Sequence, residues 1–375
     1  MQKIGITCYP TIGGSGIIAT ELGKMLADKG YEIHFISSNM PVRLDCTNQN
    51  IYYHEVEITD YPVFQYPPYD LSLAAKMAEV IDREQLDILH VHYAMPHAIS
   101  AILAKQIAEN DVKIVTTLHG TDITVLGYDK VFKRMIAFGI EKSDAVTAVS
   151  QSLVNRTKEL LQVKKDINVI YNFVNEAEYF KKEDSGLREK YHVQPDEKVI
   201  IHISNFRKVK RIDDVIKTFV KINEQIKSKM FFVGDGPELS TAIDLVTSYG
   251  LNDEVIFLGK QKSISELLSI SDIKLLMSEQ ESFGLVLLEA MACQVATIGT
   301  NVGGIPEVIE HGETGYIVEL GDVQEAANLA VKALNDKNLL EKLSQNAYHR
   351  AKVFFHSQVI VNEYIQLYEK VLGKN

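Results

Sequence analysis

Short apolar runs of strand length alternate with helical patterns along most of this 375-residue chain. Strands that alternate with helices in this way are typical of a parallel sheet with helices on both faces. In the first half, the pattern predicts strands at 3–9, 32–37, 51–57, 88–92, 113–118 and 145–149, with helices at 17–29, 71–84, 97–109 and 130–142. We therefore expect an α/β domain of the doubly wound, Rossmann-like kind.

A second strand series starts near Val199 and predicts a second domain of the same kind. Its strands are expected at 198–204, 229–233, 255–258, 273–276, 296–299 and 315–318, with helices at 212–227, 238–249, 264–270, after Phe283 and around Pro306. We place the junction near Asn172, which gives domains at 1–171 and 172–356, and we expect the helical end, about 357–375, to pack back on the first domain. Ligands of such sheets bind beside the carboxyl ends of the strands. We therefore expect the two domains to face each other across a cleft lined by strand-end loops.

The charge and cysteine content exclude several classes of partner. The net charge of −11 disfavours nucleic acid, which needs clustered Lys and Arg, so the basic run at 207–211 is a local exception. The three cysteines, Cys8, Cys46 and Cys293, are odd in number and far apart, which indicates reduced thiols. No apolar run reaches the roughly 18 residues of a membrane span. We expect a soluble, cytoplasmic protein without a membrane partner, and the sequence leaves a homo-oligomer open.

A glycine-rich turn follows the first predicted strand. Gly14, Gly16 and Ala19 match the spacing of a dinucleotide fingerprint, and such glycines let the backbone approach a phosphate at a helix start. A nicotinamide enzyme would also carry an acid at the end of the second strand, whereas that strand ends at 37–39 in Ser-Ser-Asn. The nicotinamide interpretation is therefore disfavoured, and a tight turn without a ligand remains the alternative.

Two histidine motifs follow strands of the first half. His90 and His92 lie on one face of a strand, but no nearby Cys or Glu completes a familiar metal-ligand spacing. The chain also lacks Asp-x-Asp, so we expect no metal site and interpret His90 as a core residue. His119 to Asp122 form a polar, Gly-containing loop after a buried strand, which indicates the active edge of the sheet.

The segment from Glu281 to Glu289 carries two carboxylates eight residues apart. With Ser282 as the N-cap, Glu281 would stand just before a helix and Glu289 two turns inside it, on nearly the same face. The first-turn N–H groups would then attract an anion such as a phosphate, and the carboxylates could accept from sugar hydroxyls. The alternative is an ordinary amphipathic helix with solvated acids.

Three more strand-end loops of the second half are polar or rich in glycine. They lie at 204–211, 234–237 and 301–307, and the first carries cations that could neutralise a diphosphate. Each loop alone is a weak signal, and a solvated basic loop is the alternative for 204–211. Together with Glu281 and Glu289, in this order and spacing, the three loops are a strong signal of a binding site for a sugar and a diphosphate.

These motifs resemble those of family 4 glycosyltransferases with the GT-B fold, over essentially the whole chain. The matching segments are 4–10, 13–22, 66–71, 117–124 and 204–211. They most resemble the branch of the family whose acceptor is L-malate. That resemblance implies transfer of N-acetylglucosamine from UDP-N-acetylglucosamine (UDP-GlcNAc) to the malate hydroxyl, with retention of the anomeric configuration, as the first step of bacillithiol biosynthesis. It also implies that no metal or other cofactor is needed.

The resemblance assigns roles to individual residues. Glu289 would accept from the ribose hydroxyls and Glu281 from those of the transferred sugar. Arg207 would replace the family's arginine, which is absent at Asn205. The implied catalytic residues are His119, Arg207, Lys210 and Glu281, and the implied donor-binding residues are Gly14, Ser15, Gly16, Asn205, Gly234, Phe283, Gly284, Leu285 and Glu289.

The acceptor pocket is less well defined by the sequence. Malate carries two carboxylates, so its pocket needs cations and hydroxyl donors, and the candidates are Tyr93, Thr121, Arg43 and Lys133. Plain surface charge is the alternative for Arg43 and Lys133. A related transferase with inositol phosphate or a lipid as acceptor, and a non-catalytic nucleotide-sugar-binding protein, also remain open. A lipid acceptor would favour a basic amphipathic helix, and none is apparent in the first domain.

Overall fold

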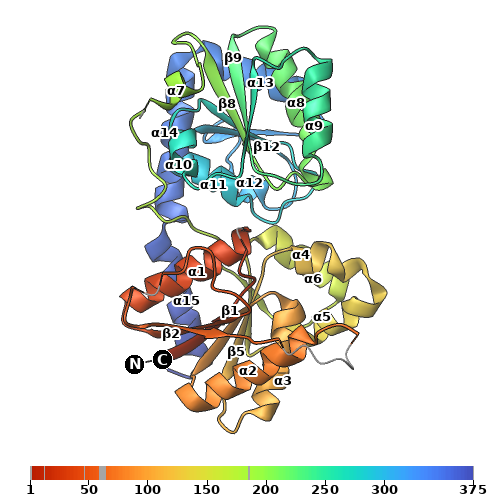
Figure 1. Cartoon of the computed structure of the whole chain (residues 1–375), viewed down its shortest axis with the longest axis vertical. Coiled ribbons are helices and arrows are strands. Elements are labelled where there is room, and N and C mark those ends of the chain that lie inside the picture. The colour runs from red at the N-terminus through yellow and green to blue at the C-terminus, as the bar shows by residue number, and fades with distance from the viewer. Residues whose placement is uncertain (1, 12, 46, 59–64, 185, 375) are drawn as a thin grey trace. The chain divides into compact units, whose positions relative to one another are not determined.

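The structure is a computed structural model that describes residues 2–11, 13–45, 47–58, 65–184 and 186–374. The chain divides into two compact units (Figure 1). Unit 1 comprises Met1–Asn172 together with Gln358–Asn375, and unit 2 comprises Phe173–Ser357. The last helix therefore belongs to the unit that begins the chain. Within the described residues, no helix combines the length and the hydropathy that crossing a bilayer requires.

Unit 1 is built on a seven-stranded sheet in the order β3-β2-β1-β4-β5-β6-β7, and all its strand pairs are parallel. Strand β4 is buried along its whole length, as expected for a central parallel strand covered on both faces. The strands are β1 (Lys3–Thr7), β2 (Glu32–Ser37), β3 (Ile51–Glu55), β4 (Ile88–His92), β5 (Lys113–Leu118), β6 (Ala145–Ala148) and β7 (Ile167–Val169).

The helices of unit 1 place their apolar faces on this sheet. For example, α2 buries Leu73, Met77 and Ile81, which lie four residues apart and so share one face. The helical segments are α1 (Gly14–Asp28), α2 (Tyr69–Glu84), η1 (Ala94–Ala98), α3 (Ile99–Ile107), α4 (Thr121–Thr124), η2 (Leu126–Tyr128), α5 (Lys130–Lys142), α6 (Gln151–Leu161) and, from the chain's end, α15 (Ser357–Val371).

Unit 2 repeats the design with a six-stranded parallel sheet in the order β10-β9-β8-β11-β12-β13. Its strands are β8 (Lys198–Ile203), β9 (Ser228–Val233), β10 (Val255–Gly259), β11 (Ile273–Leu276), β12 (Ala296–Thr300) and β13 (Gly315–Val318). Its helical segments are α7 (Leu187–Lys190), η3 (Lys208–Lys210), α8 (Ile212–Asn223), α9 (Leu239–Ser248), α10 (Ile264–Ser269), α11 (Leu285–Ala292), α12 (Ile305–Val308), α13 (Val323–Asn335) and α14 (Lys337–Phe354).

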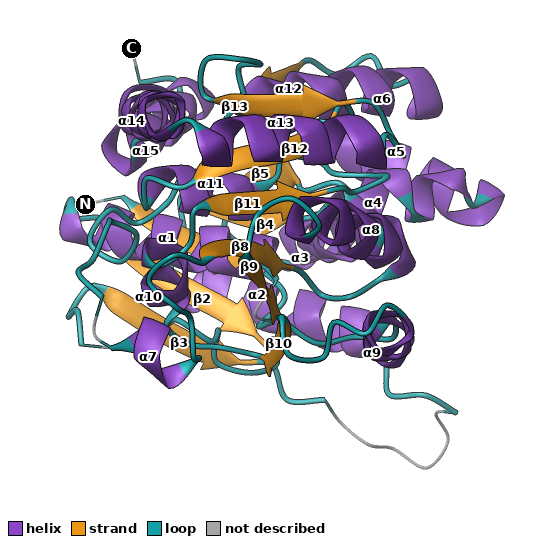
Figure 2. Cartoon of the chain, turned by 90° about the horizontal axis from the view of Figure 1, so that it is seen from above, coloured by secondary structure: helices purple, strands orange, loops and turns teal. Residues whose placement is uncertain are grey.

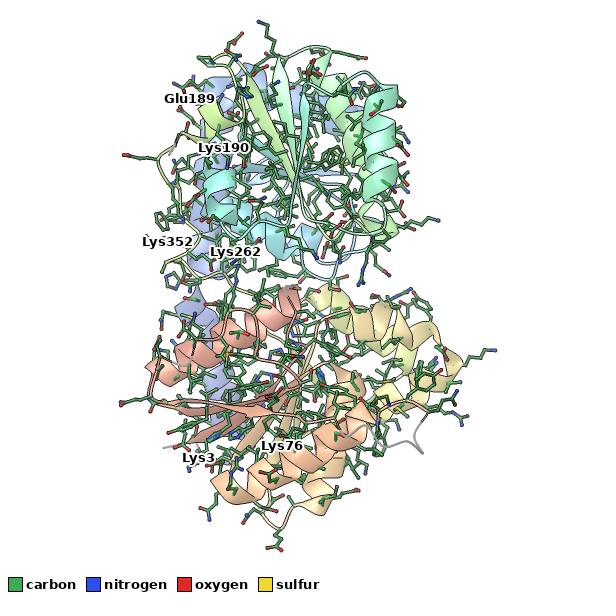
Figure 3. All side chains as sticks on the ribbon, viewed as in Figure 1. Lys3, Lys76, Glu189, Lys190, Lys262 and Lys352 are labelled. Carbon is green, nitrogen blue, oxygen red and sulfur yellow. The ribbon has the colours of Figure 1, made fainter. Side chains whose placement is uncertain are left out.

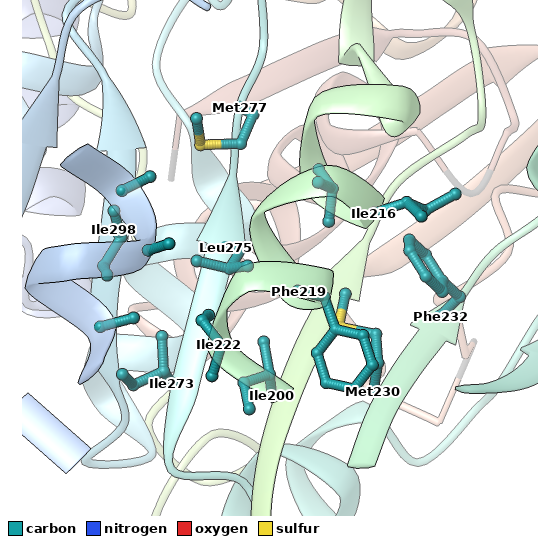
Figure 4. Close-up of a cluster of buried hydrophobic side chains, with 14 of the residues drawn as sticks. Ile200, Ile216, Phe219, Ile222, Met230, Phe232, Ile273, Leu275, Met277 and Ile298 are labelled. Carbon is teal, nitrogen blue, oxygen red and sulfur yellow. The ribbon is translucent and has the colours of Figure 1, made fainter. Parts of the chain in front are cut away.

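The core of unit 2 lies between the sheet and the helices that cover it. Ile216, Phe219 and Ile222 of α8 face Phe232 and Leu275 of the strands, and all five are buried (Figure 4). Helices follow most strands in both units, and Figure 2 shows the helices beside the strands. Charged side chains such as Lys190, Lys262 and Lys352 are exposed (Figure 3). The expected α/β class and the two Rossmann-like sheets are confirmed.

Candidate active site

In unit 2, the loops that follow two neighbouring strands bring Lys210 and Glu281 together. Strands β8 and β11 are adjacent in the sheet, so the loops after them emerge side by side. The Lys210 Nζ lies 2.5 Å from a Glu281 carboxylate oxygen, and each side chain is 17% exposed. The Glu279 N–H also donates to the Val209 carbonyl at 2.8 Å, which joins the two loops through their backbones. The two predicted residues are thus in direct contact, and their role in a donor site stays a prediction.

A third loop, after β12, contacts the backbone of Glu281. The Gly304 N–H donates to the Glu281 carbonyl at 3.0 Å. A Cβ on Gly303 would lie 1.8 Å from the Glu281 carbonyl oxygen, and one on Gly304 would lie 2.3 Å from that of Ser282. Both positions therefore exclude any side chain. This backbone contact gives the glycine-rich loop at 301–307 a physical role in fixing the position of Glu281.

Helix α11 begins later than the sequence predicted. Its N-cap is Gly284, with φ 93°, and the helix runs from Leu285 to Ala292. The prediction of Ser282 as the N-cap is wrong, because the left-handed backbone of Gly284 cannot be part of a right-handed helix. Glu289 consequently lies about one turn inside the helix rather than two. The N–H groups of Leu285 and Val286 are in the first turn, where helix geometry provides no intrahelical acceptor.

Lys274 is a buried lysine near this site that the sequence reasoning missed. It lies on β11, is 0% exposed, and donates to the Leu275 carbonyl at 3.4 Å. Burial holds the pKa of Lys274 well below its ordinary value, while the charges of Glu289 and Glu281 act in the opposite direction. Glu289 is itself only 5% exposed. The sequence did contain a signal that could have identified Lys274, because it is a lysine inside an otherwise apolar strand.

Close backbone packing also shapes the loops around Asn205 and Gly234. A Cβ on Gly234 would lie 1.8 Å from the Ser204 carbonyl oxygen, and one on Gly236 would lie 2.0 Å from that of Asn205. Arg207 is exposed in the same loop. The predicted donor residues Asn205 and Gly234 therefore belong to two loops in direct contact, and the role of Arg207 stays a prediction.

Replacing Gly234 with Ala should destabilise unit 2. Gly234 has φ +122° and no space for a Cβ, whereas Gly250 has φ +69° and nothing within 4 Å of a Cβ. The Gly250→Ala control should cost about 1–3 kcal/mol from backbone strain alone. Gly234→Ala adds a backbone clash and should lower the melting temperature several degrees further. Equal melting temperatures for the two variants would contradict the predicted contact.

In unit 1, α1 starts directly after the glycine-rich turn. Gly13 is the N-cap, so Gly14 and Ser15 present first-turn N–H groups. A Cβ on Gly16 would lie 2.6 Å from the carbonyl oxygens of Thr11 and Tyr9, so this position requires glycine. The predicted glycine turn thus forms a helix N-terminus suited to an anion.

A histidine-rich group lies beside this turn in the same unit. The Tyr93 hydroxyl donates to the Ser15 hydroxyl at 2.9 Å, and its ring centroid lies 5.4 Å from that of His119. His92 Nδ1 and His119 Nε2 are 2.7 Å apart. Burial lowers the pKa of His119 to about 3, so its ring is neutral at pH 7. The expected polar loop is therefore in contact with the glycine turn through Tyr93.

Asp122 holds the two strand-end loops of this group together. One of its carboxylate oxygens accepts from the Ala94 N–H at 2.9 Å, and the other accepts from the Gly120 N–H at 3.0 Å. Burial raises the pKa of Asp122 to about 6. At pH 7 the group is mainly a carboxylate, and it links the loop after β4 to the loop after β5. Asp122 therefore positions the loop that carries His119.

The four acceptor candidates are only partly brought together. Tyr93 and Thr121 belong to the two loops that Asp122 joins. Arg43 follows β2, and Lys133 lies on α5, so their place in an acceptor pocket stays a prediction.

Helix α5 overturns one expectation about unit 1. Its exposed side chains include Val131, Met135 and Phe138, at helical spacing, beside the exposed cations Lys130 and Arg134. The expectation that this domain lacks a basic amphipathic helix is therefore wrong.

One group in the described part of the chain has metal-ligand geometry, and it lies apart from the predicted site residues. Ligand atoms of His34, His54 and Glu84 are within 4.8 Å of one another. The ring nitrogens already form a hydrogen-bonded chain, since Arg83 contacts His54, His54 contacts His34 at 2.9 Å, and His34 contacts Glu32 at 3.0 Å. These contacts account for the arrangement of both histidines.

Comparison with known proteins identifies the family. The pattern of Glycosyltransferase Family 4 matches residues 12–178, and that of Glycosyl transferases group 1 matches residues 184–350. The chain is also 56% identical, over 370 residues, to N-acetyl-alpha-D-glucosaminyl L-malate synthase of Bacillus anthracis, with 99% of this chain and 97% of that protein covered. The chain belongs to glycosyltransferase family 4.

Solved structures agree with the fold of this glycosyltransferase. Sucrose-phosphate synthase of Thermosynechococcus elongatus has a TM-score of 0.83 at 20% identity, with 100% of both chains covered. HepE of Anabaena, solved in complex with UDP-glucose, has a TM-score of 0.83 at 22% identity and covers 99% of this chain and 100% of its own. The enzyme thus has the two Rossmann-like sheets of the GT-B fold, as the motifs predicted.

Proposed function

We propose that this glycosyltransferase moves N-acetylglucosamine from UDP-GlcNAc to the hydroxyl of L-malate, with retention of the anomeric configuration. The observation that carries the proposal is the 56% identity to the malate synthase of Bacillus anthracis, which extends over 99% of the chain and so includes both units. This reaction would be the first step of bacillithiol biosynthesis. The site geometry supports the proposal through its charges.

The positive groups of unit 2 suit a departing UDP. As the bond from the sugar C1 to UDP breaks, negative charge develops on the diphosphate and positive charge on the sugar ring. Lys210 and the N-terminus of α11 are fixed positive features on one side of unit 2, and such preorganised charge is an effective way to stabilise a leaving group. Arg207 would add a second cation from the same loop as Lys210.

The carboxylates then act as holders of hydroxyl groups. Glu281, held by Gly304 and Lys210, would accept from the hydroxyls of the sugar, and the buried Glu289 would accept from those of the ribose. We propose that the malate oxygen attacks C1 from the face that UDP leaves. The hydroxyl proton would pass to the departing phosphate oxygen, so no residue of the chain forms a covalent bond to the sugar.

Release of UDP tests this proposal. The protein should release UDP from UDP-GlcNAc at a rate that rises with L-malate and saturates. Inositol phosphate and a detergent-dispersed lipid alcohol, offered in place of malate, should give only the rate of slow hydrolysis. UDP release that depends on another acceptor, and not on malate, would keep the family and refute the proposed substrate.

Removal of divalent metal should leave the reaction unchanged. We expect equal rates before and after treatment with EDTA, because Lys210, Arg207 and the α11 N-terminus supply the positive charge that a metal ion provides in other transferases. The measurement is malate-dependent UDP release by EDTA-treated protein, with and without added Mg²⁺ or Mn²⁺. A loss of activity that either ion restores would contradict this expectation.

A further inference from the structure

Helix α15, at the end of the chain, contributes two buried tyrosines to unit 1. Tyr364 and Tyr368 are 1% and 0% exposed. The Tyr368 hydroxyl lies 2.7 Å from His90 Nδ1, and His90 Nε2 lies 2.7 Å from the Thr117 hydroxyl. Tyr364 makes a weaker contact, 3.4 Å, with the same Thr117 hydroxyl. A hydroxyl of the last helix therefore meets the ring of a core histidine.

The histidines continue from this contact to the site. The rings of His90 and His92 are stacked, with centroids 4.6 Å apart and an interplanar angle of 27°. The rings of His92 and His119 are also stacked, at 5.0 Å, and are joined by the 2.7 Å contact between His92 Nδ1 and His119 Nε2. A continuous row of ring contacts thus runs from Tyr368 to His119, entirely within unit 1.

The hydrogen-bond pattern fixes which nitrogen of His119 carries the proton. Within the described part of the chain, His92 Nε2 is buried without a hydrogen-bond partner. A buried lone pair is less costly to leave unpaired than a buried N–H, so the proton of His92 belongs on Nδ1. His92 then donates to His119 Nε2, and the proton of the neutral His119 is on Nδ1.

The same reasoning gives the direction of the Tyr368 contact. Within the described residues, the Tyr368 hydroxyl makes one hydrogen bond, to His90 Nδ1. A buried O–H needs an acceptor, so Tyr368 donates, and the proton of His90 lies on Nε2, where it is donated to Thr117. His90 is thereby fixed at both nitrogens, and its ring supports that of His92.

We propose that Tyr368 is a positioning residue for His119, acting through the stacked rings of His90 and His92. The role of the C-terminal helix is then to hold the ring of His119 in the place from which its Nδ1–H reaches an oxygen of the transferred sugar. This inference rests on the proposed function only for the contact between His119 and the sugar. The arrangement of the rings is independent of the substrate.

Replacing Tyr368 with Phe tests the proposal by deleting one hydroxyl. The kcat for malate-dependent UDP release should fall between roughly tenfold and a hundredfold, the range expected for a misplaced catalytic group. The affinity for UDP alone should not change, because the proposed UDP contacts of unit 2 do not include Tyr368. Tyr364→Phe, on the same helix but not bonded to His90, is the matched control and should keep the wild-type kcat.

A double variant separates positioning from general destabilisation. If Tyr368 acts through His119, then Tyr368→Phe should cause no further loss in a protein that already carries His119→Ala. Additive losses in the double variant, or a wild-type kcat in Tyr368→Phe, would overturn the proposal.

Nitrogen NMR of histidine-labelled protein tests the arrangement of the rings without any turnover. The wild type should show His119 protonated at Nδ1. Tyr368→Phe should keep this tautomer, which His92 sets, and should shift the ring resonances of His92 and His119, because the stacked rings move. If malate gives no turnover but these resonances shift as expected, the substrate assignment has failed and the positioning role of Tyr368 stands. If the His119 ring resonances are the same in the two proteins, the positioning role has failed, whatever the substrate.

Discussion

Replacing Lys210 with Met should lower kcat/KM for UDP-GlcNAc by roughly 10²–10³-fold, the usual loss when one preorganised charge at a developing anion is removed. Met keeps much of the length of the side chain and removes its charge. The Lys210 ammonium group is paired with Glu281 at 2.5 Å, in a position where each side chain is 17% exposed. We expect the affinity for UDP to fall as well, because in the proposed site the charge would face the diphosphate in both the ground state and the transition state.

The control for this variant is Lys208→Met in the same short helical turn. Lys208 is exposed, and it lies two residues from Lys210, so it tests the effect of net charge in this loop. Its substitution should change kcat/KM less than about threefold, because removing a solvated surface charge has only a small effect. Equal losses for the two variants would mean that the loop acts as a diffuse positive surface and that the position of Lys210 has no special role.

Replacing Glu281 with Gln should lower kcat by roughly a hundredfold, the upper range for a hydrogen bond that loses its charged partner. The substitution keeps the shape of the side chain and the backbone contact with Gly304. It weakens the acceptor for the sugar hydroxyls and removes the partner of Lys210. Steady-state rates with saturating malate measure the effect, and Glu279→Gln, an exposed neighbour, is the control.

The slow variant Lys210→Met distinguishes two mechanisms of retention, because it keeps every carboxylate. A double displacement needs a carboxylate nucleophile and forms a glycosyl-enzyme, which a slow variant can accumulate. Attack from the leaving-group face forms no such adduct. Intact-protein mass spectrometry of Lys210→Met, incubated with UDP-GlcNAc in the absence of malate, should therefore show the unmodified chain. An added N-acetylglucosaminyl mass on any carboxylate would contradict the front-face path.

The order of strands and helices could be predicted because apolar runs and helical periods were clear. Strands such as Glu32–Ser37, Ile88–His92 and Lys113–Leu118 have the predicted bounds. Helix α6 was missed although Ser150 caps it, with its side chain accepting from the Leu153 N–H. That capping signal was in the sequence. Strand β7 has three residues, which is too short for a periodic pattern.

Residue types pointed to candidate site residues but not to the contacts between them. At Gly16 and Gly234, close backbone approach leaves no alternative to glycine, and their place in a donor site stays a prediction. The start of α11 was wrong because Ser282 is a good cap by type, whereas the conformation of Gly284 depends on tertiary contacts. The pairing of Lys210 with Glu281 joins residues 71 positions apart, and no local pattern records such a contact.

Gln294, just after α11, shows how tertiary structure overrides a local preference. Gln294 has φ 58°, the left-handed conformation that glycine favours. The Val295 N–H still donates to the Ala290 carbonyl at 2.9 Å. The helix exit is thus kept despite the cost of a side chain at this position.

The structure of the product is the most direct test of the account. Protein incubated with UDP-GlcNAc and L-malate should yield UDP and one new compound with the mass of N-acetylglucosaminyl malate. Its proton NMR spectrum should show the small H1–H2 coupling of an α-glycoside, the configuration of the donor. A β-glycoside would contradict retention, and the absence of any malate adduct while UDP is released would contradict the proposed acceptor.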